Sequence, residues 1–581
     1  GAGELTLSGT NTFTGDLTIS EGTLSVSGGS ALADSVDVIV DDGATLNLNS
    51  SETIASLANS VGAALNGATV ALGANTLTLA GPGATTFNGV ISGTGASRLD
   101  VTGTGDLTLT GDSTMTGVMV SSSGGNLAIA AGGSTAAIGF GAGTGGATAS
   151  TAGAALASNA IVAAGFGGAL TFTGNETVGS AQVDSISSMT LTGATLTLNG
   201  TANTFNPSGA SVIAGAVNGT GTLNVAGNTT TVQSTGNVTA ATTVGAAGTL
   251  VNDGTMAGVT NAGSTTNNLT MGAVGNTGTF TNTATGSAGA LTNTGAGTGS
   301  NAGTLASLSH GSTGTFTNTG IVSGTTTLSA GTVALNAGSN LSDSANVTVN
   351  GGTLDVNTAE TIGSLSGSGG TVQLDGALTT GGNGGSTSFA GVFAGASDLN
   401  KAGGGVMTLT GSSSGQTGAI NVTAGGLSYS GSGATTGSLD IETASGAALN
   451  SDGGTFQTGL VITNAGTTTL TGSESIAAIT GAGGVALTGG ATTLTLNGTG
   501  TNSGAISGDG SLIVAAGATT LAGTNTYTGT TTVTGGSLEL QNGAAIADTG
   551  AVVVNAGTLT VTDAETIGSL AGSGGTVQMD D

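Results

Sequence analysis

Short segments of this chain alternate apolar and polar residues over four or five positions and then stop at Gly, Asn or Asp. Examples near the start are LTLSG, DLTIS, TLSVS, VDVIV and TLNLN. Alternation with a period of two residues predicts a strand with one buried face, and the stops predict turns. The segments recur about every 8–12 residues, a spacing typical of all-β proteins. Helical periodicity is nearly absent, so the pattern predicts an all-β fold.

Internal repeats decide among the all-β architectures. Residues 347–375 and 552–580 are identical at 22 of 29 positions, and residues 9–57 align with 523–570 after one insertion. Closed barrels do not grow indefinitely, whereas stacked turns do. We therefore predict a right-handed parallel β-helix, or β-solenoid, of about 25 rungs with roughly 20–25 residues in each. With about 4.8 Å between paired strands, a single elongated rod would be on the order of 120 Å long.

The composition of each repeat suits such a rung. Leu, Ile and Val would face inward, because one rung cannot bury its apolar face alone but a stack can. Gly and Asn would supply positive φ at the corners. Asn350 and Asn555 occupy equivalent corners. We expect amides at such corners to stack as a hydrogen-bonded ladder.

Several longer phrases resemble a known family. They are FNGVISG (residues 87–93), GDLTL (105–109), LNKAG (399–403), LAGTNTYTG (521–529) and GGSL (535–538). Their order is similar to that of the autotransporter passenger-associated repeat, over about two thirds of the chain. The resemblance implies the β-helical stalk of a bacterial protein that is exported across the outer membrane to the cell surface or the medium. The family's outer-membrane barrel is not expected here, because the ~10-residue strands and aromatic girdles of such barrels are missing.

We expect one continuous β-helix over residues 1–581, with internal variation. Residues 1–120 and 321–581 carry passenger-type repeats. Residues 121–227 are Ala- and Gly-rich, with irregular rungs. Residues 228–320 are rich in Asn, Thr and Gly, with short phrases such as FTNT that predict narrower rungs. Disorder of this last region is the alternative.

Charge and cysteine content restrict the partners. The net charge is −28, and Arg98 and Lys401 are the two basic residues. Nucleic acid is excluded because phosphate binding needs a basic patch, and an anionic membrane would repel the chain. There is no Cys, no apolar run of ~18–20 residues and no signal peptide at Gly1. We predict no membrane insertion within this segment, and a removed or external signal if the protein is secreted.

Side chains for catalysis are scarce. His310 is the single histidine, with Ser309 and Ser312 beside it in LSHGSTG. Triads are defined by geometry, so we interpret His310 as an exposed or corner residue. An enzyme acting on polysaccharides is the alternative, because other β-helix proteins cleave them. A hydrolase needs paired carboxylates, but thirty acids make chance pairs such as Asp41–Asp42 inevitable, and we interpret these as solvated turn residues. Aromatic side chains on which a sugar could stack are scarce, since Trp is absent and Tyr429 and Tyr527 are the only tyrosines. We predict no catalytic residue.

Recurring acids raise the possibility of calcium. Asp34, Asp343 and Asp548 fall in equivalent turns, but the calcium repeat G-G-x-G-x-D is missing. Glutamates precede Thr-Ile at positions 52, 360 and 565, and we interpret them as solvent-facing corner acids. The threonine strings 325–327 and 530–532 leave ice binding as a further alternative. We predict no metal-binding residue, no cofactor and no cofactor-binding residue.

Neither end of the chain has the pattern of a capping rung. Residues 1–9 align with 403–411, inside a repeat, and residues 577–580 align with 372–375. We expect a segment of a longer protein, or a subunit that stacks end to end with further copies of itself. Contact with a host or neighbouring cell would occur through regions outside this chain. The expected function is a non-enzymatic stalk, or a filament-forming segment, that serves adhesion or cell-surface architecture.

Overall fold

The structure is a computed structural model. It describes residues 1–580 except 61–66, 112, 122–125, 130–134, 141–147, 152–155, 165–168, 173–175, 179–182, 185–187, 192–194, 199–203, 207–209, 338–339, 432 and 434. Parts of the predicted region 121–227, and Pro207, lie outside the described residues. The described chain is a parallel β-solenoid of about 26 turns without helices, which confirms the predicted fold class. The right-handed coiling stays a prediction. No helix long and apolar enough to cross a bilayer occurs in the described part.

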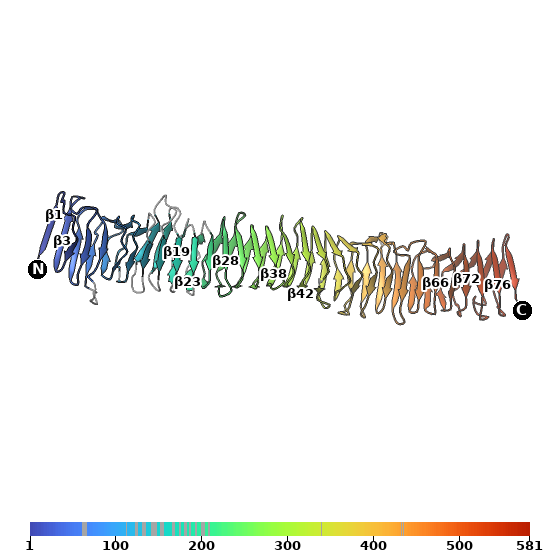
Figure 1. Cartoon of the computed structure of the whole chain (residues 1–581). Helices are drawn as coiled ribbons and strands as arrows, with labels where there is room; N and C mark the ends of the chain where they lie inside the picture. The colour runs from blue at the N-terminus through green and yellow to red at the C-terminus, as the bar shows by residue number, and fades with distance from the viewer. Residues whose placement is uncertain are drawn as a thin grey trace. The chain divides into compact units, whose positions relative to one another are not determined.

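The strands fall into two compact units, Gly1–Gly289 and Ala290–Asp581, each of which is described by itself. Within each unit, strands of successive turns lie side by side (Figure 1). The first sheet of unit 1 contains β1 (Glu4–Ser8), β3 (Gly22–Ser27), β5 (Ala44–Leu48), β8 (Thr69–Ala71) and β11 (Val90–Ser92). A longer file in the same unit contains β10 (Thr85–Phe87), β13 (Leu107–Leu109), β15 (Asn126–Ile129), β17 (Thr148–Thr151), β19 (Ala169–Phe172), β22 (Ser188–Leu191), β25 (Ser211–Ile213), β28 (Thr229–Val232), β31 (Thr249–Asn252), β34 (Ser264–Asn267) and β37 (Thr279–Asn282).

Unit 2 repeats this arrangement. One file contains β39 (Thr298–Asn301), β41 (Thr315–Asn318), β44 (Thr332–Leu335), β47 (Thr353–Val356), β50 (Thr371–Leu374), β53 (Val392–Gly395) and β57 (Gly415–Gln416). A later one contains β52 (Thr387–Phe389), β55 (Val406–Leu409), β59 (Gly426–Ser430), β62 (Ala448–Asp452), β64 (Thr467–Leu470), β67 (Gly484–Leu487) and β70 (Ile506–Gly508). The last turns add β65 (Glu474–Ile476), β68 (Thr493–Leu496), β71 (Ser511–Val514), β73 (Thr531–Val533), β75 (Ala551–Val554) and β77 (Ser569–Ala571).

The core is a set of apolar columns that run through the stack. In unit 2, Leu354 lies in register between Val333 of the turn before and Val372 of the turn after. All three side chains are 0% exposed. Their neighbours in the strand point outward, as the alternation of the sequence predicts. Each turn therefore buries its apolar face only against the turns next to it.

Turns are shorter in the Asn/Thr/Gly-rich region than at the start of the chain. Asn47 and Ser25, on adjacent turns, are 22 residues apart, whereas Asn252 and Asn267 are 15 residues apart. A 15-residue turn here passes through three short strands, for example β31, β32 (Thr255–Met256) and β33 (Val259–Asn261). A narrow turn leaves little room for apolar side chains, and inward Asn and Thr take part of their place.

Glycine is required where a turn enters a strand. Gly536 of the phrase GGSL has a φ of 66°, and a Cβ at this position would lie 2.3 Å from the carbonyl oxygen of Gly517 on the preceding turn. Any other residue would strain the backbone and collide with the neighbouring turn. Glycine supplies nearly all of the positive φ in the described ranges, and the one other residue with positive φ is Asn542, so the predicted role of Asn holds at a single corner.

An asparagine ladder exists, but at positions other than the predicted corners. The side-chain oxygens of Asn350 and Asn555 accept hydrogen bonds from Ser368 and Ser573 of the next turn, not from another amide. The ladder lies inside the narrow turns. There Asn252 donates to Asn267 at 2.7 Å, and Asn267 donates to Asn282 at 2.8 Å. Buried amides are stabilised by such bonds, since an unpaired one would be costly.

The column structure predicts a local response to mutation. Leu354→Ala is expected to cost about 2–5 kcal/mol, because it empties a fully buried site. Since each turn contacts only its neighbours, the loss should be confined to β44, β47 and β50. Hydrogen exchange of these strands measures it. Thr353→Ala, at the outward-facing residue before it, should change their stability by no more than about 0.5 kcal/mol. Equal losses in both variants would contradict the assigned register.

Candidate functional site

The single histidine lies inside the stack. His310 ends β40 (Thr304–His310) and is 0% exposed, while the preceding Ser309 points to solvent. The amide nitrogen of Asn293, on the turn before, lies 3.1 Å from Nδ1 of His310. Nε2 lies 3.1 Å from the carbonyl oxygen of Gly314. The predicted exposed or corner position is therefore wrong, and the ring faces away from Ser309.

The hydrogen bonds fix the tautomer of the His310 ring. An amide nitrogen can only donate, so Nδ1 of His310 accepts from Asn293 and Nε2 carries the proton that it donates to Gly314. Burial lowers the pKa of His310 below its ordinary value, and the bond to Gly314 opposes part of that shift. Ser312 does not complete a triad, because its hydroxyl accepts from the backbone N–H of Gly314. The ring joins two turns.

The first of the recurring glutamates holds the loop of the preceding turn. Glu52 opens β6 (Glu52–Ile54) and is 3% exposed. Its Oε1 accepts from the backbone N–H of Leu32 at 3.0 Å, and its Oε2 accepts from that of Ala31 at 3.2 Å. One carboxylate thus pairs two consecutive backbone donors that the turn itself cannot satisfy. We name this arrangement the glutamate clamp.

The two-donor clamp recurs at Glu565, and Glu360 and Glu474 make backbone contacts of the same kind. Glu565 accepts from the backbone N–H groups of Ala545 and Ile546, at 3.1 and 2.6 Å. Glu360 accepts from Leu341 at 3.0 Å, and Glu474 accepts from Phe456 at 2.9 Å. Glu360 and Glu474 are 5% and 4% exposed. The interpretation of Glu52 and Glu360 as solvent-facing acids is wrong. These side chains face the interior, where they bond to the neighbouring turn.

An asparagine bonds to the same loop from its other side. Asn525 of the phrase GTNTYTG is 3% exposed, and its Nδ2 donates to the carbonyl oxygen of Ala545 at 2.7 Å. Its Oδ1 accepts from the backbone N–H of Ile506 on the preceding turn. Asn11 donates in the same way to Ala31 at 2.8 Å. Asn525, the Ala545 loop and Glu565 therefore connect successive turns, and the first copy repeats the contact to the loop.

The acids considered as calcium ligands are exposed and separate. Asp34, Asp343 and Asp548 lie at exposed turn positions. Of the chance pair, Asp42 is exposed and accepts from the backbone N–H of Gly67, and Asp41 is half-buried. Throughout the described ranges, no three of the His, Cys, Asp and Glu side chains are grouped as metal ligands.

The central threonine of each string and both tyrosines face inward. Thr326 and Thr531 are 0% exposed, whereas the other members of each string are exposed or half-buried, so the three residues of a string do not share one outward face. Tyr429 and Tyr527 are buried as well, at 0% and 1% exposure, and cannot act as surface platforms. Burial raises the pKa of Tyr429 to about 12 and raises that of Tyr527. The hydroxyl of Tyr527 bonds to that of Thr531 at 2.5 Å.

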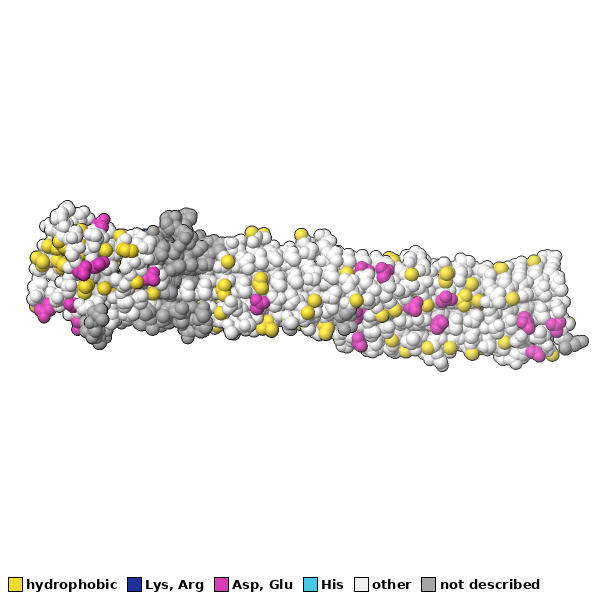
Figure 2. Space-filling view, viewed as in Figure 1, with side chains coloured by type: hydrophobic (Ala, Val, Ile, Leu, Met, Phe, Trp, Pro, Cys, Tyr) yellow, Lys and Arg dark blue, Asp and Glu magenta, His cyan; other side chains and the backbone are white. Residues whose placement is uncertain are grey.

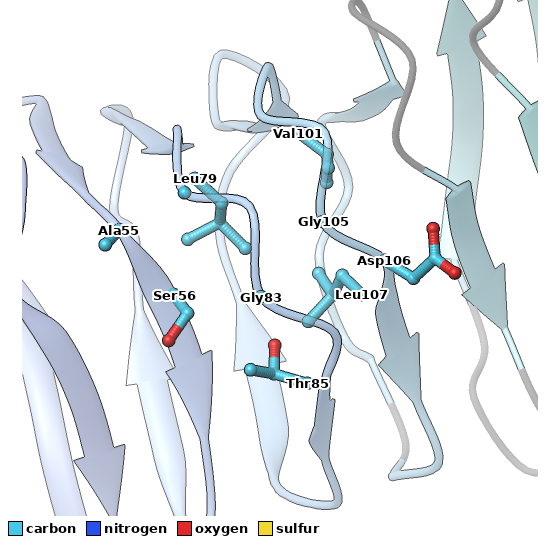
Figure 3. Close-up of a pocket in the computed structure, with 10 residues that line it drawn as sticks. Ala55, Ser56, Leu79, Gly83, Thr85, Val101, Gly105, Asp106 and Leu107 are labelled. Carbon is cyan, nitrogen blue, oxygen red and sulfur yellow. The ribbon is translucent and has the colours of Figure 1, made fainter.

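Two hollows in the described surface lack catalytic groups. Figure 3 shows the first, between turns near Leu79 and Leu107, which has room for about one water molecule. Its one carboxylate, Asp106, points away from Ser56 and Thr85 and accepts from the backbone N–H of Asn126. The second is shallow and neutral. Its lining consists of Ser414, Thr435, Thr436, Thr455, Phe456, Gln457 and Thr458.

Comparison with known families supports the predicted resemblance. Residues 1–26, 99–129, 399–428 and 516–540 match the model of the passenger-associated-transport-repeat. In these four segments the chain is similar to this family. The matched segments make up about a fifth of the chain, less than the phrases suggested. No curated protein and no solved structure matches the chain.

The segments that match the passenger-associated repeat contain some of the residues that bond neighbouring turns together. Asn11 and Asn525 lie in matched segments, whereas Glu52, Glu360 and Glu565 lie outside them. His310 and the asparagine ladder are also outside. The repeat therefore supplies the asparagine that holds the loop, and the glutamate comes from the turn that follows.

The repeat also contains a buried cation. Lys401, in the phrase LNKAG, is 1% exposed. Its Nζ donates to the carbonyl oxygens of Ala402, Gly403 and Ala424, at 2.6, 3.0 and 3.2 Å. Burial lowers its pKa. Three carbonyl dipoles thus solvate the ammonium group, and Lys401 connects its own turn to the turn of Ala424. Arg98 instead pairs with Asp100 at 3.0 Å on the surface.

Sequence reasoning missed these buried polar residues, although a signal was present. Glu52 lies two residues before Ile54, His310 two after Leu308, and Lys401 two after Leu399. Residues two apart in a strand share a face, so each polar side chain had to be inward if its apolar neighbour was. The visible surface correspondingly presents few ionisable side chains. Figure 2 shows acidic side chains scattered singly or in small groups, with no Lys or Arg on that face.

The glutamate clamp predicts the effect of removing one acceptor. Glu52→Gln turns an NH₂ group toward one of the two backbone N–H groups, which loses its partner. We expect a local loss of about 1–3 kcal/mol, measured by hydrogen exchange of residues 31–36. Asp34→Asn, on the same loop but exposed, should have little effect. A loss in Asp34→Asn as large as that in Glu52→Gln would refute the clamp.

Burial of the glutamates predicts a pH dependence. Burial raises the pKa of Glu52 and Glu474, and their backbone hydrogen bonds oppose part of the rise. The folded loops therefore bind protons more tightly than open ones. Their stability is fully present below the ordinary pKa of 4.5 and is lost as the pH rises through the raised pKa. Hydrogen exchange, corrected for its intrinsic pH dependence, should show residues 31–36 and 456–460 better protected at about pH 5 than at about pH 7. In Glu52→Gln this response should disappear from residues 31–36 alone.

Proposed function

We propose that this chain is a non-enzymatic structural segment of a bacterial passenger protein, a stalk or filament-forming part at the cell surface or in the medium. One observation carries the proposal. The histidine, the buried lysine and the buried glutamates are engaged in bonds between turns: His310 with Asn293, Lys401 with Ala424, and the glutamates with the loop before them. A side chain held in this way cannot approach a substrate without opening the stack.

Similarity to the passenger-associated-transport-repeat family supports display outside the cell, since this family implies secretion across the outer membrane. The net charge of −28 favours rods that repel one another and remain dispersed. Adhesion or surface architecture is the role that such a segment would serve. As partners we propose further copies stacked end to end, or a host or neighbouring cell contacted through regions outside this chain.

Imaging of the producing cells tests the proposed display. Antibody raised against this chain should label intact cells or the medium, because the segment would lie beyond the outer membrane. Electron microscopy of the labelled surface then separates the two forms: isolated spikes with a distal tip indicate a stalk, and continuous periodic fibres indicate a filament. Labelling that requires permeabilised cells would refute display.

The absence of catalysis is tested separately. The purified chain should release no product from a panel of acidic and neutral glycans, because its histidine, its buried lysine and its buried glutamates are engaged in bonds between turns. Asp41→Asn combined with Asp42→Asn serves as the matched control, since these residues form the adjacent pair from which a hydrolase could be built. Turnover by the chain that disappears in this variant would overturn the proposal.

A further inference from the structure

We propose that His310 is an acid-responsive joint: when the ring gains a proton, the turns around residues 305–328 open, while turns joined only by asparagine remain closed. The inference concerns a conformational device and goes beyond the proposed structural role. It rests on the position of the ring in a hydrogen-bonded file and on the absence of charge around it.

The asparagine ladder shows which hydrogen-bonding group is needed at the position of His310. In unit 1, Oδ1 of Asn267 accepts from Asn252 and its Nδ2 donates to Asn282. Asn261 and Asn276 form a second file with the same direction, at 2.6 Å. In unit 2, Asn301 donates to Asn318 at 2.7 Å. Asn252, Asn261, Asn267 and Asn301 thus donate to the following turn, which presents an acceptor, whereas Asn276, Asn282 and Asn318 donate to nearby backbone carbonyls.

His310 occupies such an acceptor position. Asn293 ends its strand as Asn276 ends β36 (Val274–Asn276), and its Nδ2 points to Nδ1 of His310. A neutral imidazole satisfies this contact as well as an amide oxygen would, because it has one acceptor nitrogen and one donor nitrogen. Unlike an amide, however, the ring loses its acceptor when it takes up a proton.

Protonation places two donors face to face. With a hydrogen on Nδ1, the imidazolium of His310 confronts the NH₂ group of Asn293, and Nε2 continues to donate to Gly314. Rotating the amide of Asn293 would present an oxygen to the ring, but it would reverse the direction that the ladder has at Asn252, Asn261 and Asn301. The contact between the two turns is therefore lost or inverted.

No anion is placed to hold the resulting cation. The elements packed against the ring are the strand segment that ends at Asn293, the loop 311–314, β41 with Phe316, β43 (Thr326–Leu328) and Gly331. None of them contains another charged or titratable residue. The nearest acids along the sequence are Asp253 and Asp343. A buried cation without a counter-charge is costly enough to favour opening to solvent.

There is also little space for the ring to move within the fold. A Cβ at Gly331, on the next turn, would lie 3.0 Å from Nε2 of His310, and the ring of Phe316 lies 6.2 Å away between centroids. The imidazolium must therefore leave its place for solvent, and the surrounding strands separate as it does so.

The direction of the pH effect follows from the lowered pKa of His310. A group whose folded pKa is below its unfolded value contributes stability that is fully present above the unfolded pKa, here about 6.5, and is lost as the pH falls through the folded pKa. Between these two values, the equilibrium constant for opening should increase by up to about tenfold per pH unit. This direction is opposite to that expected at the buried glutamates.

Hydrogen exchange of the intact chain at about pH 7.5 and pH 5 tests the joint, with rates corrected for intrinsic chemistry. Residues 305–328 should lose protection at the lower pH, by up to about tenfold for each pH unit below about 6.5. Residues 249–282, which contain the asparagine-only ladder, are the internal control and should keep their protection. Unchanged protection of 305–328, or an equal loss in both segments, would overturn the proposal.

His310→Asn is the matched variant. The oxygen of the introduced amide can accept a hydrogen bond from Asn293 and does not take up a proton in this pH range. The acid response of residues 305–328 should therefore vanish, while their protection at pH 7.5 is retained. If the variant does not fold locally, the natural chain provides a second test. Because it has one histidine, selective labelling gives a single imidazole NMR signal. That signal should report the neutral Nε2–H form at neutral pH, and should titrate together with the loss of protection. Titration without loss of protection would refute the joint.

Discussion

In the described part of this protein, the turns do not satisfy their hydrogen bonds by themselves, and the other features of the structure depend on that constraint. Backbone groups of one turn pair with the next, and the same holds for the polar side chains that the narrow interior encloses. Glu52 pairs the loop of Ala31 and Leu32, and Asn525 pairs those of Ile506 and Ala545. Stability is thus a property of adjacent turns, not of any one of them.

Each type of buried polar side chain bonds to a different kind of partner on the neighbouring turn. A carboxylate offers two acceptors and fits a loop with two consecutive free N–H groups, as at Glu565. An ammonium group offers donors alone and fits converging carbonyls, as at Lys401. An amide offers both and can continue from turn to turn. The stretch from Asp253 to Asp343 contains no acid in between, and there amides and one imidazole make the inward contacts.

The sequence was sufficient to predict the parallel solenoid, the approximate number of turns and the family, because apolar alternation and repetition follow directly from stacking. It did not lead us to the inward position of Glu52, His310 and Lys401. The ionisable character of these three side chains favoured the surface, whereas the alternation of their strands favoured the interior. Alternation was the stronger constraint, because a single residue cannot change face without moving its strand. The corner amides were predicted to stack, but at Asn350 the next turn offers a serine rather than a second amide.

The asparagine ladder also restricts how this region can change in length. Asn252, Asn267 and Asn282 follow one another at intervals of 15 residues, and each amide is useful only where the turns on both sides present its complement. Loss of one residue would send the amide to the outer face and leave two buried groups unpaired. Loss or gain of a whole turn would preserve every bond except those at the junction. In this region, insertions and deletions should therefore be tolerated where they keep each amide in register with its partners, as whole turns do.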